Sequence, residues 1–209
     1  MERDPMPGTR FEGEPQTLWL NEAGQDRKMR LVESLRFYDR RGHPWEAPKD
    51  SVIDGASIPR ALWSLVGSPY TGDYRRASVV HDIACVNAHD PAARKAADRM
   101  FYEACREGGC SVAQSIILYI GVRIGAKTGR GEAGDIGPRL AIDALDREIV
   151  LTFSDVAQIV LANALADDAE VVEAQVDEAF EIVRRAGEAS TMLRNGGPSE
   201  LFISFGERR

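Results

Sequence analysis

The chain has 209 residues, of which 44% are hydrophobic and 28% are charged, so it can bury the core of one domain with a small extension. Its net charge of −7 argues against nucleic-acid binding, which usually needs a basic surface, and against electrostatic attraction to an anionic membrane. A lipid or small-molecule substrate and a protein partner remain as expected binding partners.

The compartment is predicted from signals that the sequence lacks. Residues 1–13 are polar and contain no apolar signal-peptide core, and the most apolar run, residues 115–124, is too short to span a bilayer. The three cysteines contain no metal-type doublet and, as an odd set, argue against a disulfide framework. We therefore expect a cytoplasmic protein without a transmembrane segment, although export by a specialised secretion system would leave no such signal.

Short strands are expected in the first quarter of the chain. Residues 1–15 are polar and rich in proline and glycine, which predicts a disordered tail before a main domain over residues 16–128. Residues 18–20 and 28–38 contain alternating apolar and polar positions, and residues 45–53 add a further stretch. These stretches predict a small antiparallel sheet at the N-terminus.

Helices are predicted after this sheet. Ser57 is a suitable N-cap for a short helix, and Asp90-Pro91 is a strong helix start, because aspartate caps and proline fits the first helical position. Gly108-Gly109 ends the helix that begins there. The predicted helices of the main domain cover residues 59–66, 73–87, 91–106 and 111–127.

The last third of the chain is predicted to be a helical extension. Residues 129–138 contain four glycines and a proline and are the best candidate for a linker. Residues 154–166 and 169–194 have the apolar spacing of amphipathic helices, and residues 139–209 contain no histidine or cysteine. We expect this extension to serve in packing or in binding a protein partner. The expected fold class is α+β and mainly α, with a central helical hairpin.

The hairpin carries the main candidate site. If residues 73–87 and 91–106 form an antiparallel pair, His81 and Asp98 lie opposite each other, because both are equally far from the turn centre between His89 and Asp90. Asp98 would then hydrogen-bond one ring nitrogen of His81 and leave the other free to accept a proton. Asp82 points about 100° around the helix and is therefore freer to bind a cation or a substrate group.

Other polar residues lie next to this pair in the predicted fold. Asp54, Ser57 and Arg60 occupy the junction between strands and helices, where functional groups often lie, and Tyr70 follows in a loop. We predict substrate-binding or supporting roles for these four residues. Helix capping is the structural alternative for Asp54 and Ser57. Buried His–Asp pairs also occur as purely structural contacts, and that alternative applies to His81 and Asp98.

Three motifs in order carry a family resemblance. Asp54-Gly55-Ala56-Ser57-Ile58-Pro59-Arg60, then Val80-His81-Asp82, then Ala97-Asp98 with Phe101, resemble the family called domain of unknown function 1353, found in bacteria and their phages. The resemblance covers roughly residues 18–125. The family name implies no activity.

A second resemblance is mechanistic. A Gly/Pro-rich loop at residues 67–72, then His81-Asp82 on a helix, then Asp98 on an antiparallel helix, is similar to the arrangement in secreted phospholipases A2. This resemblance implies that His81 activates water, Asp98 orients His81, and Asp82 binds Ca²⁺ together with loop carbonyls. It also implies that the cation polarises a lipid ester.

Three functions therefore remain open from the sequence. The first is a hydrolase that uses His81 and Asp98 with Ca²⁺ or another divalent cation at Asp82, acting on a lipid ester. The second is a metal-dependent phosphohydrolase, for which His43 and Asp98 would be further ligands. The third is a non-catalytic, phage-derived structural or interaction protein, in which the His–Asp pair only stabilises the hairpin.

Overall fold

The structure is a computed structural model that describes residues 7–21, 28–55, 57–67, 72–129, 143–163 and 165–194. It confirms a mainly helical α+β fold with small antiparallel sheets at the N-terminus. The strands are β1 (Arg10–Glu12), β2 (Thr17–Trp19), β3 (Met29–Leu31), β4 (Leu35–Tyr38), β5 (Pro44–Ala47) and β6 (Val52–Ile53). The helices are the 3-10 turn η1 (Arg60–Leu62), α1 (Trp63–Val66), α2 (Arg75–Val86), α3 (Pro91–Gly108), α4 (Val112–Thr128), α5 (Ala144–Leu161) and α6 (Ala169–Arg194).

The strands form two three-stranded antiparallel sheets, with strand orders β1-β4-β5 and β2-β3-β6. Alternation sets which face is buried: Leu35 and Phe37 of β4 are fully buried, whereas Arg36 between them is exposed. Strand β1 pairs with β4, so the prediction of a disordered tail was wrong for residues 10–12. Their pairing depends on a partner strand distant in sequence, which local composition does not reveal.

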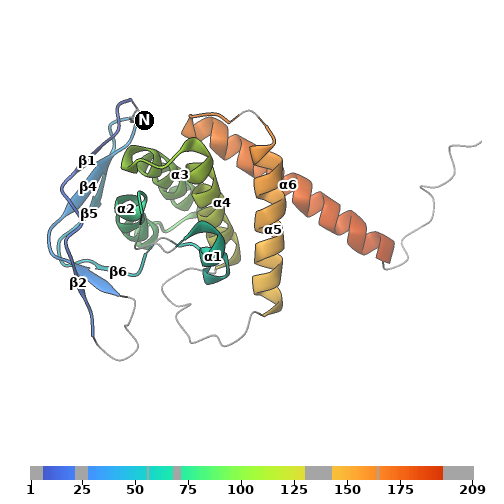
Figure 1. Ribbon diagram of the computed structural model, residues 1–209, viewed down its shortest axis with the longest axis horizontal. Coiled ribbons are helices and arrows are strands. Elements are labelled where there is room, and N and C mark those ends of the chain that lie inside the picture. The colour runs from blue at the N-terminus through green and yellow to red at the C-terminus, as the bar shows by residue number, and fades with distance from the viewer. Residues whose placement is uncertain are drawn as a thin grey trace, which may run out of the picture.

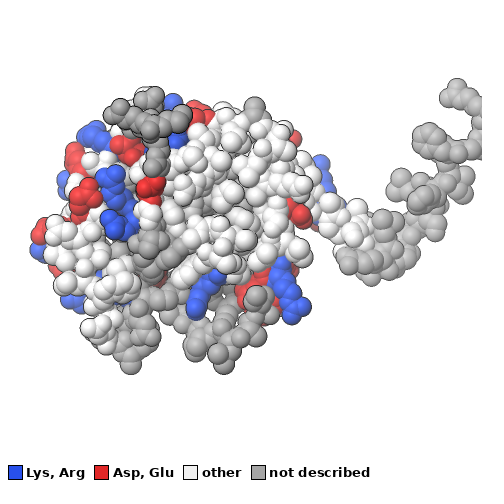
Figure 2. Space-filling view, viewed as in Figure 1, with Lys and Arg blue, Asp and Glu red and all other residues white. Residues whose placement is uncertain are grey.

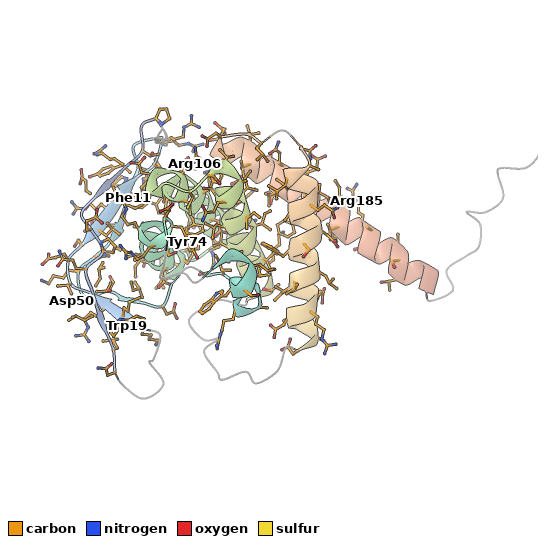
Figure 3. All side chains as sticks on the ribbon, viewed as in Figure 1. Phe11, Trp19, Asp50, Tyr74, Arg106 and Arg185 are labelled. Atoms are coloured by element: carbon orange, nitrogen blue, oxygen red, sulfur yellow. The ribbon has the colours of Figure 1, made fainter. Side chains whose placement is uncertain are left out.

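The elements are arranged in successive layers (Figure 1). Helix α2 lies between the sheets and helices α3 and α4, and α5 lies on the far side of α4. The second half of α6 extends beyond the body of the molecule, where Arg185 is labelled in Figure 3. At the opposite side Trp19 lies at the outer end of β2 and is 56% exposed. None of the helices within the described residues is long and apolar enough to cross a membrane.

Helix boundaries follow local capping chemistry. The Asp90 side chain accepts hydrogen bonds from the amides of Ala92 and Ala93 at 2.8 Å, and α3 ends at Gly109 in the left-handed conformation. Helix α5 begins at Ala144 rather than at residue 154 as predicted, because Asp143 and Asp146 form a reciprocal capping box that starts the helix earlier.

The two C-terminal helices belong to the same core as the rest of the chain. Ile149 and Val156 of α5 and Val172 and Val176 of α6 are buried in the cluster that also contains the apolar residues of α2, α3 and α4. An ion pair also joins the last turn of α3 to the segment before α6, where Arg106 Nε lies 2.8 Å from Asp167 Oδ1. The predicted helical extension therefore packs onto the main domain and completes its core.

A close backbone contact fixes the hairpin of α2 and α3. A Cβ atom at Gly108 would lie 2.2 Å from the carbonyl oxygen of Asp73, so only glycine allows the start of α2 to approach the end of α3 this closely. On the next helix, a Cβ atom at Gly121 would lie 3.3 Å from the Ile58 side chain. The first contact joins the segment before α2 to the end of α3, and the second joins α4 to the segment after β6.

Candidate active site

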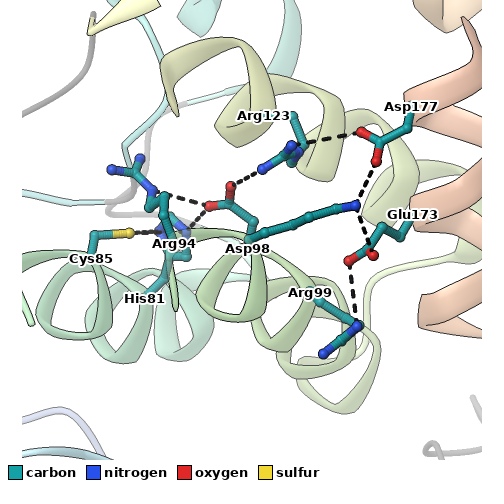
Figure 4. A network of polar contacts seen from close by, with 9 residues as sticks. His81, Cys85, Arg94, Asp98, Arg99, Arg123, Glu173 and Asp177 are labelled. Atoms are coloured by element: carbon teal, nitrogen blue, oxygen red, sulfur yellow. Dashed lines mark hydrogen bonds and ion pairs between the residues drawn. The ribbon is translucent and has the colours of Figure 1, made fainter. Parts of the chain in front are cut away.

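The contact predicted between His81 and Asp98 is present. His81 comes from α2 and Asp98 from α3, and their side chains are both fully buried. The His81 Nε2 atom lies 2.9 Å from the Asp98 Oδ1 atom (Figure 4). The centre of the imidazole ring lies 4.7 Å from the centre of the Phe101 ring. The antiparallel hairpin therefore places the imidazole and the carboxylate in direct hydrogen-bond contact inside the core.

Two arginines that the sequence analysis did not assign to the site complete the surroundings of Asp98. Arg123 of α4 donates from Nη1 to Oδ2 at 3.0 Å, and Arg94 of α3 donates from Nε to Oδ1 at 3.4 Å. A sequence signal for Arg123 existed, because it is the charged residue within the apolar run of residues 115–124. Both carboxylate oxygens of Asp98 are thus engaged by cationic groups.

The network continues into the C-terminal helix α6. Arg123 Nη2 lies 3.6 Å from Asp177 Oδ1, and Lys95 Nζ lies 2.6 Å from the other oxygen of Asp177. Lys95 also contacts Glu173, which pairs with Arg99 (Figure 4). Helix α6, expected only to pack or to bind a partner, therefore supplies two carboxylates that hold the cations behind Asp98.

The charges of the His81–Asp98 pair follow from these neighbours. Burial alone would lower the pKa of His81, but the adjacent Cys85 and the hydrogen bond with Asp98 outweigh it and raise the pKa to about 9. Burial alone would raise the pKa of Asp98, but the hydrogen bond and charge of His81, together with Arg94 and Arg123, hold it below its usual range. Near neutral pH the pair is therefore an imidazolium and a carboxylate.

Cys85 is the third member of the site. It lies one turn after His81 on α2, and its Sγ atom is 3.3 Å from Nε2 and 3.7 Å from Nδ1 of that ring. The thiol is half-buried, unlike those of Cys105 and Cys110, which are fully buried. The sequence relation that places His81 opposite Asp98 also places Cys85 opposite Arg94, but it did not assign Cys85 a role.

A pocket of about 630 Å³ opens beside Cys85. His81 itself has no exposed surface, so within the described residues Cys85 is the group that both contacts His81 and faces the pocket. The lining side chains that carry charge or a reactive group are Ser57, Asp82, Cys85, His89, Asp90, Arg94, Arg123 and Lys127.

Asp82 faces the junction after β6. It is 8% exposed, and its Oδ2 atom accepts the Asp54 amide at 2.7 Å. Burial and the nearby charge of Asp54 raise the pKa of Asp82 to about 7. Ser57 is buried and also lines the pocket, so the structure brings Ser57 and Asp82 to one wall. The predicted neighbour Asp54 contacts that wall through its backbone.

The remaining predicted site residues lie elsewhere. The Arg60 guanidinium lies 5.8 Å from the centre of the Trp63 ring, and Arg60 is not among the residues that line the pocket. Tyr70 and most of the expected calcium loop lie outside the described residues. His43 packs edge-on against Trp45 near β5, so the structure does not bring it to Asp98 as the phosphohydrolase hypothesis requires.

The donor atoms of His81, Cys85 and Asp98 lie within 4.8 Å of one another. Nitrogen, sulfur and carboxylate ligands suit Zn²⁺ rather than Ca²⁺, which prefers oxygen. The two arginines on Asp98 compete with a metal ion for its oxygens. This arrangement favours a proton-sharing Cys–His–Asp chain over a metal centre at these three atoms.

Comparisons with known proteins add a family and two relatives. Residues 29–122 match the model of the family described as protein of unknown function DUF1353. The chain is 40% identical over 81 residues to the uncharacterized protein y4jT of Sinorhizobium fredii, covering 38% of this chain and 23% of that protein. It is 31% identical over 166 residues to the uncharacterized protein y4iH of the same organism, covering 78% of this chain and 66% of that protein.

The two relatives differ in how much of their length this chain covers. The alignment with y4iH is longer than the family segment, so the similarity to that protein extends beyond residues 29–122. The chain spans about a quarter of y4jT and about two thirds of y4iH. No solved structure matches the chain at a significant level.

Proposed function

Starting from the membership of residues 29–122 in the DUF1353 family, we propose that the protein is a hydrolase with a Cys85–His81–Asp98 catalytic chain. Cys85 is the nucleophile, His81 exchanges its proton, and Asp98 orients His81. The observation that carries this proposal is the position of Cys85, whose thiol contacts the buried imidazole and also faces the pocket. A nucleophile beside a base that a third group orients is the recurring pattern of covalent catalysis.

Access decides between His81 and Cys85 as the group that meets the substrate. A base acting directly on water, as the phospholipase A2 resemblance implies, needs an open ring nitrogen. His81 is fully buried, with Nε2 held by Asp98 and with Cys85 between the ring and the pocket. A substrate in the pocket therefore meets the thiol first, and His81 acts through it.

The two ring nitrogens of His81 have different roles in this proposal. Asp98 lies 2.9 Å from Nε2, so that nitrogen donates its hydrogen to the carboxylate, and Nδ1 is left to exchange a proton with Sγ, which lies 3.7 Å from Nδ1 and 3.3 Å from Nε2. The pair that attacks a substrate is a thiolate and an imidazolium. A thiolate next to a protonated histidine is the reactive form of cysteine.

The reaction runs in two balanced steps. The Cys85 thiolate attacks the carbonyl carbon of an ester, the bond from that carbon to the alcohol oxygen breaks, and the leaving alkoxide takes a proton from a water molecule in the pocket. The hydroxide that remains attacks the resulting thioester and breaks the carbon–sulfur bond. This second step releases the acid and restores the thiolate beside the imidazolium of His81.

Site-resolved alkylation tests the proposal. Iodoacetamide should modify Cys85 in the folded protein, and the rate at pH 7 should fall about tenfold or more in His81→Gln. Cys105 is an internal control, because it is fully buried and should not react before unfolding. Cys85→Ser should also abolish hydrolysis of short-chain nitrophenyl esters and of phosphatidylcholine vesicles. Alkylation of Cys85 that is unchanged by His81→Gln would refute the catalytic chain.

The non-catalytic alternative has an observation of its own. The carboxylate of Asp98 is engaged by His81, Arg94 and Arg123, so the pair links α2, α3 and α4 as a structural network would. Under that alternative, Cys85→Ser would leave every property except thiol alkylation unchanged. Unchanged ester hydrolysis in Cys85→Ser, measured against wild type, would favour it.

A divalent cation at Asp82 is a second proposal that one observation favours. Burial and then the nearby charge of Asp54 raise the pKa of Asp82 to about 7, and a bound cation would compensate for both. Ser57 on the same wall could add an oxygen ligand. Calorimetric titration of Ca²⁺, Mg²⁺, Mn²⁺ and Zn²⁺ into wild type and Asp82→Asn tests the site. Binding that the substitution abolishes would support it, and absence of binding by all four ions would exclude it.

A further inference from the structure

The charges around the pocket do not balance. The network of Figure 4 contains three carboxylates and four lysine or arginine side chains. The carboxylates are Asp98, Glu173 and Asp177, and the cations are Arg94, Lys95, Arg99 and Arg123. This surplus is local, because the whole chain has a net charge of −7.

The side chains that line the pocket also carry more positive than negative charges. Arg94, Arg123 and Lys127 line it, and Lys127 is exposed at its edge. The two acidic lining residues are already engaged by backbone amides: Asp90 caps α3 through Ala92 and Ala93, and Asp82 accepts the Asp54 amide. In addition, Arg123 retains donor capacity, because its buried Nε–H has no acceptor within the part of the chain that the structure describes.

From this arrangement we infer that the pocket binds an oxyanion group of the substrate, a carboxylate or a phosphate, beside Cys85. The inference rests on the proposed function, since it names the class of substrate that the thiol would attack. Charged walls of one sign around a concave site concentrate ligands of the opposite sign. Guanidinium groups also match the planar, bidentate geometry of carboxylate and phosphate oxygens. The substrate is therefore an acidic ester rather than an uncharged one.

Two alkylating reagents that differ only in charge test the inference. Iodoacetate is an anion and iodoacetamide is neutral, so the ratio of their rates at Cys85 reports the potential in the pocket. We expect this ratio to be higher in the folded protein than for Cys85 in the urea-unfolded chain. It should fall about two- to threefold in Lys127→Met, as removal of one exposed charge predicts. Lys49→Met is the matched control, because Lys49 is also an exposed lysine and does not line the pocket.

The outcomes separate this inference from the proposed catalytic chain. A ratio equal to or below that of the unfolded chain would overturn the inference even where His81→Gln slows both reagents. A raised ratio that Lys127→Met lowers would support it even where His81→Gln has no effect. Protection of Cys85 by inorganic phosphate or by acetate then identifies the oxyanion, and a raised ratio without protection by either would also overturn binding.

Discussion

Replacement of Asp98 by asparagine tests the central pair most directly. The substitution keeps the size of the side chain but removes the charge that His81, Arg94 and Arg123 share. Removing one partner of a buried ion pair costs about 3–5 kcal/mol, because the remaining charges stay buried without compensation. The pKa of His81, raised from 6.5 to about 9, corresponds to roughly 3 kcal/mol, of which Cys85 supplies a part. We therefore expect a loss of about 3 kcal/mol in the free energy of unfolding.

Urea unfolding at pH 7, followed by circular dichroism, measures this loss. Glu103→Gln is the matched control, because Glu103 lies on the same helix, is 7% exposed and accepts the Arg40 amide at 2.9 Å. An amide oxygen can keep that hydrogen bond, so the control should cost about 1 kcal/mol or less. A cost for Asp98→Asn no larger than that of Glu103→Gln would refute the reasoning that Asp98 balances the buried cations.

Three further outcomes follow from the structure. Because folding raises the pKa of His81 to about 9, the stability that its positive charge contributes is complete below pH 6.5 and is lost as the pH rises through 9. Unfolding free energies measured from pH 6 to pH 10 should show this loss in wild type and not in His81→Gln. Because the pKa of Asp82 is raised from 3.8 to about 7, its ionisation lowers stability as the pH rises from 3.8 to 7, and this loss is complete at pH 8. Asp82→Asn at pH 8 should therefore be at least as stable as wild type, and a loss above about 1 kcal/mol would contradict this. Gly108→Ala should destabilise the fold by about 1–3 kcal/mol or more in thermal melts, because the new Cβ would lie 2.2 Å from the Asp73 carbonyl oxygen. Gly187→Ala is the control: its Cβ would enter open space, so it should stabilise the fold by about 0.5–1 kcal/mol.

Local signals predicted the helices well and the strands less well. Asp90-Pro91, Gly109 and Ser111 mark helix ends through side-chain and backbone chemistry within a few residues, so the sequence alone located α3 and the start of α4. Strand β1 depends on pairing with β4, which local composition does not reveal. Helix α5 begins at the capping box of Asp143 and Asp146, a local signal that lies after the predicted linker and before the predicted helix start at residue 154.

The contacts of the candidate site were also predicted only where they are local in sequence. Helical periodicity and the short turn predicted the contact between His81 and Asp98, because both residues belong to one hairpin. Arg123 reaches Asp98 from a third helix, and Asp177 reaches Arg123 from a fourth, so their roles depend on tertiary packing. The predicted role of Asp82 as a cation ligand stays a prediction. Its backbone contact with Asp54 required the loop after β6 to be placed.

The ion pair of Arg123 with Asp177 has a consequence for how the chain could be divided. The family model ends at residue 122, yet Arg123 and its partner on α6 come after that boundary. Figure 2 shows charged side chains of both signs over the side of the sheets, whereas the ion pairs of Asp98 with Arg94 and Arg123 are largely buried between the helices. The segment that the family model matches is thus smaller than the unit that folds here. A fragment of this chain cut at residue 122 would lose Arg123, which pairs with Asp98, and helix α5, which packs on α4.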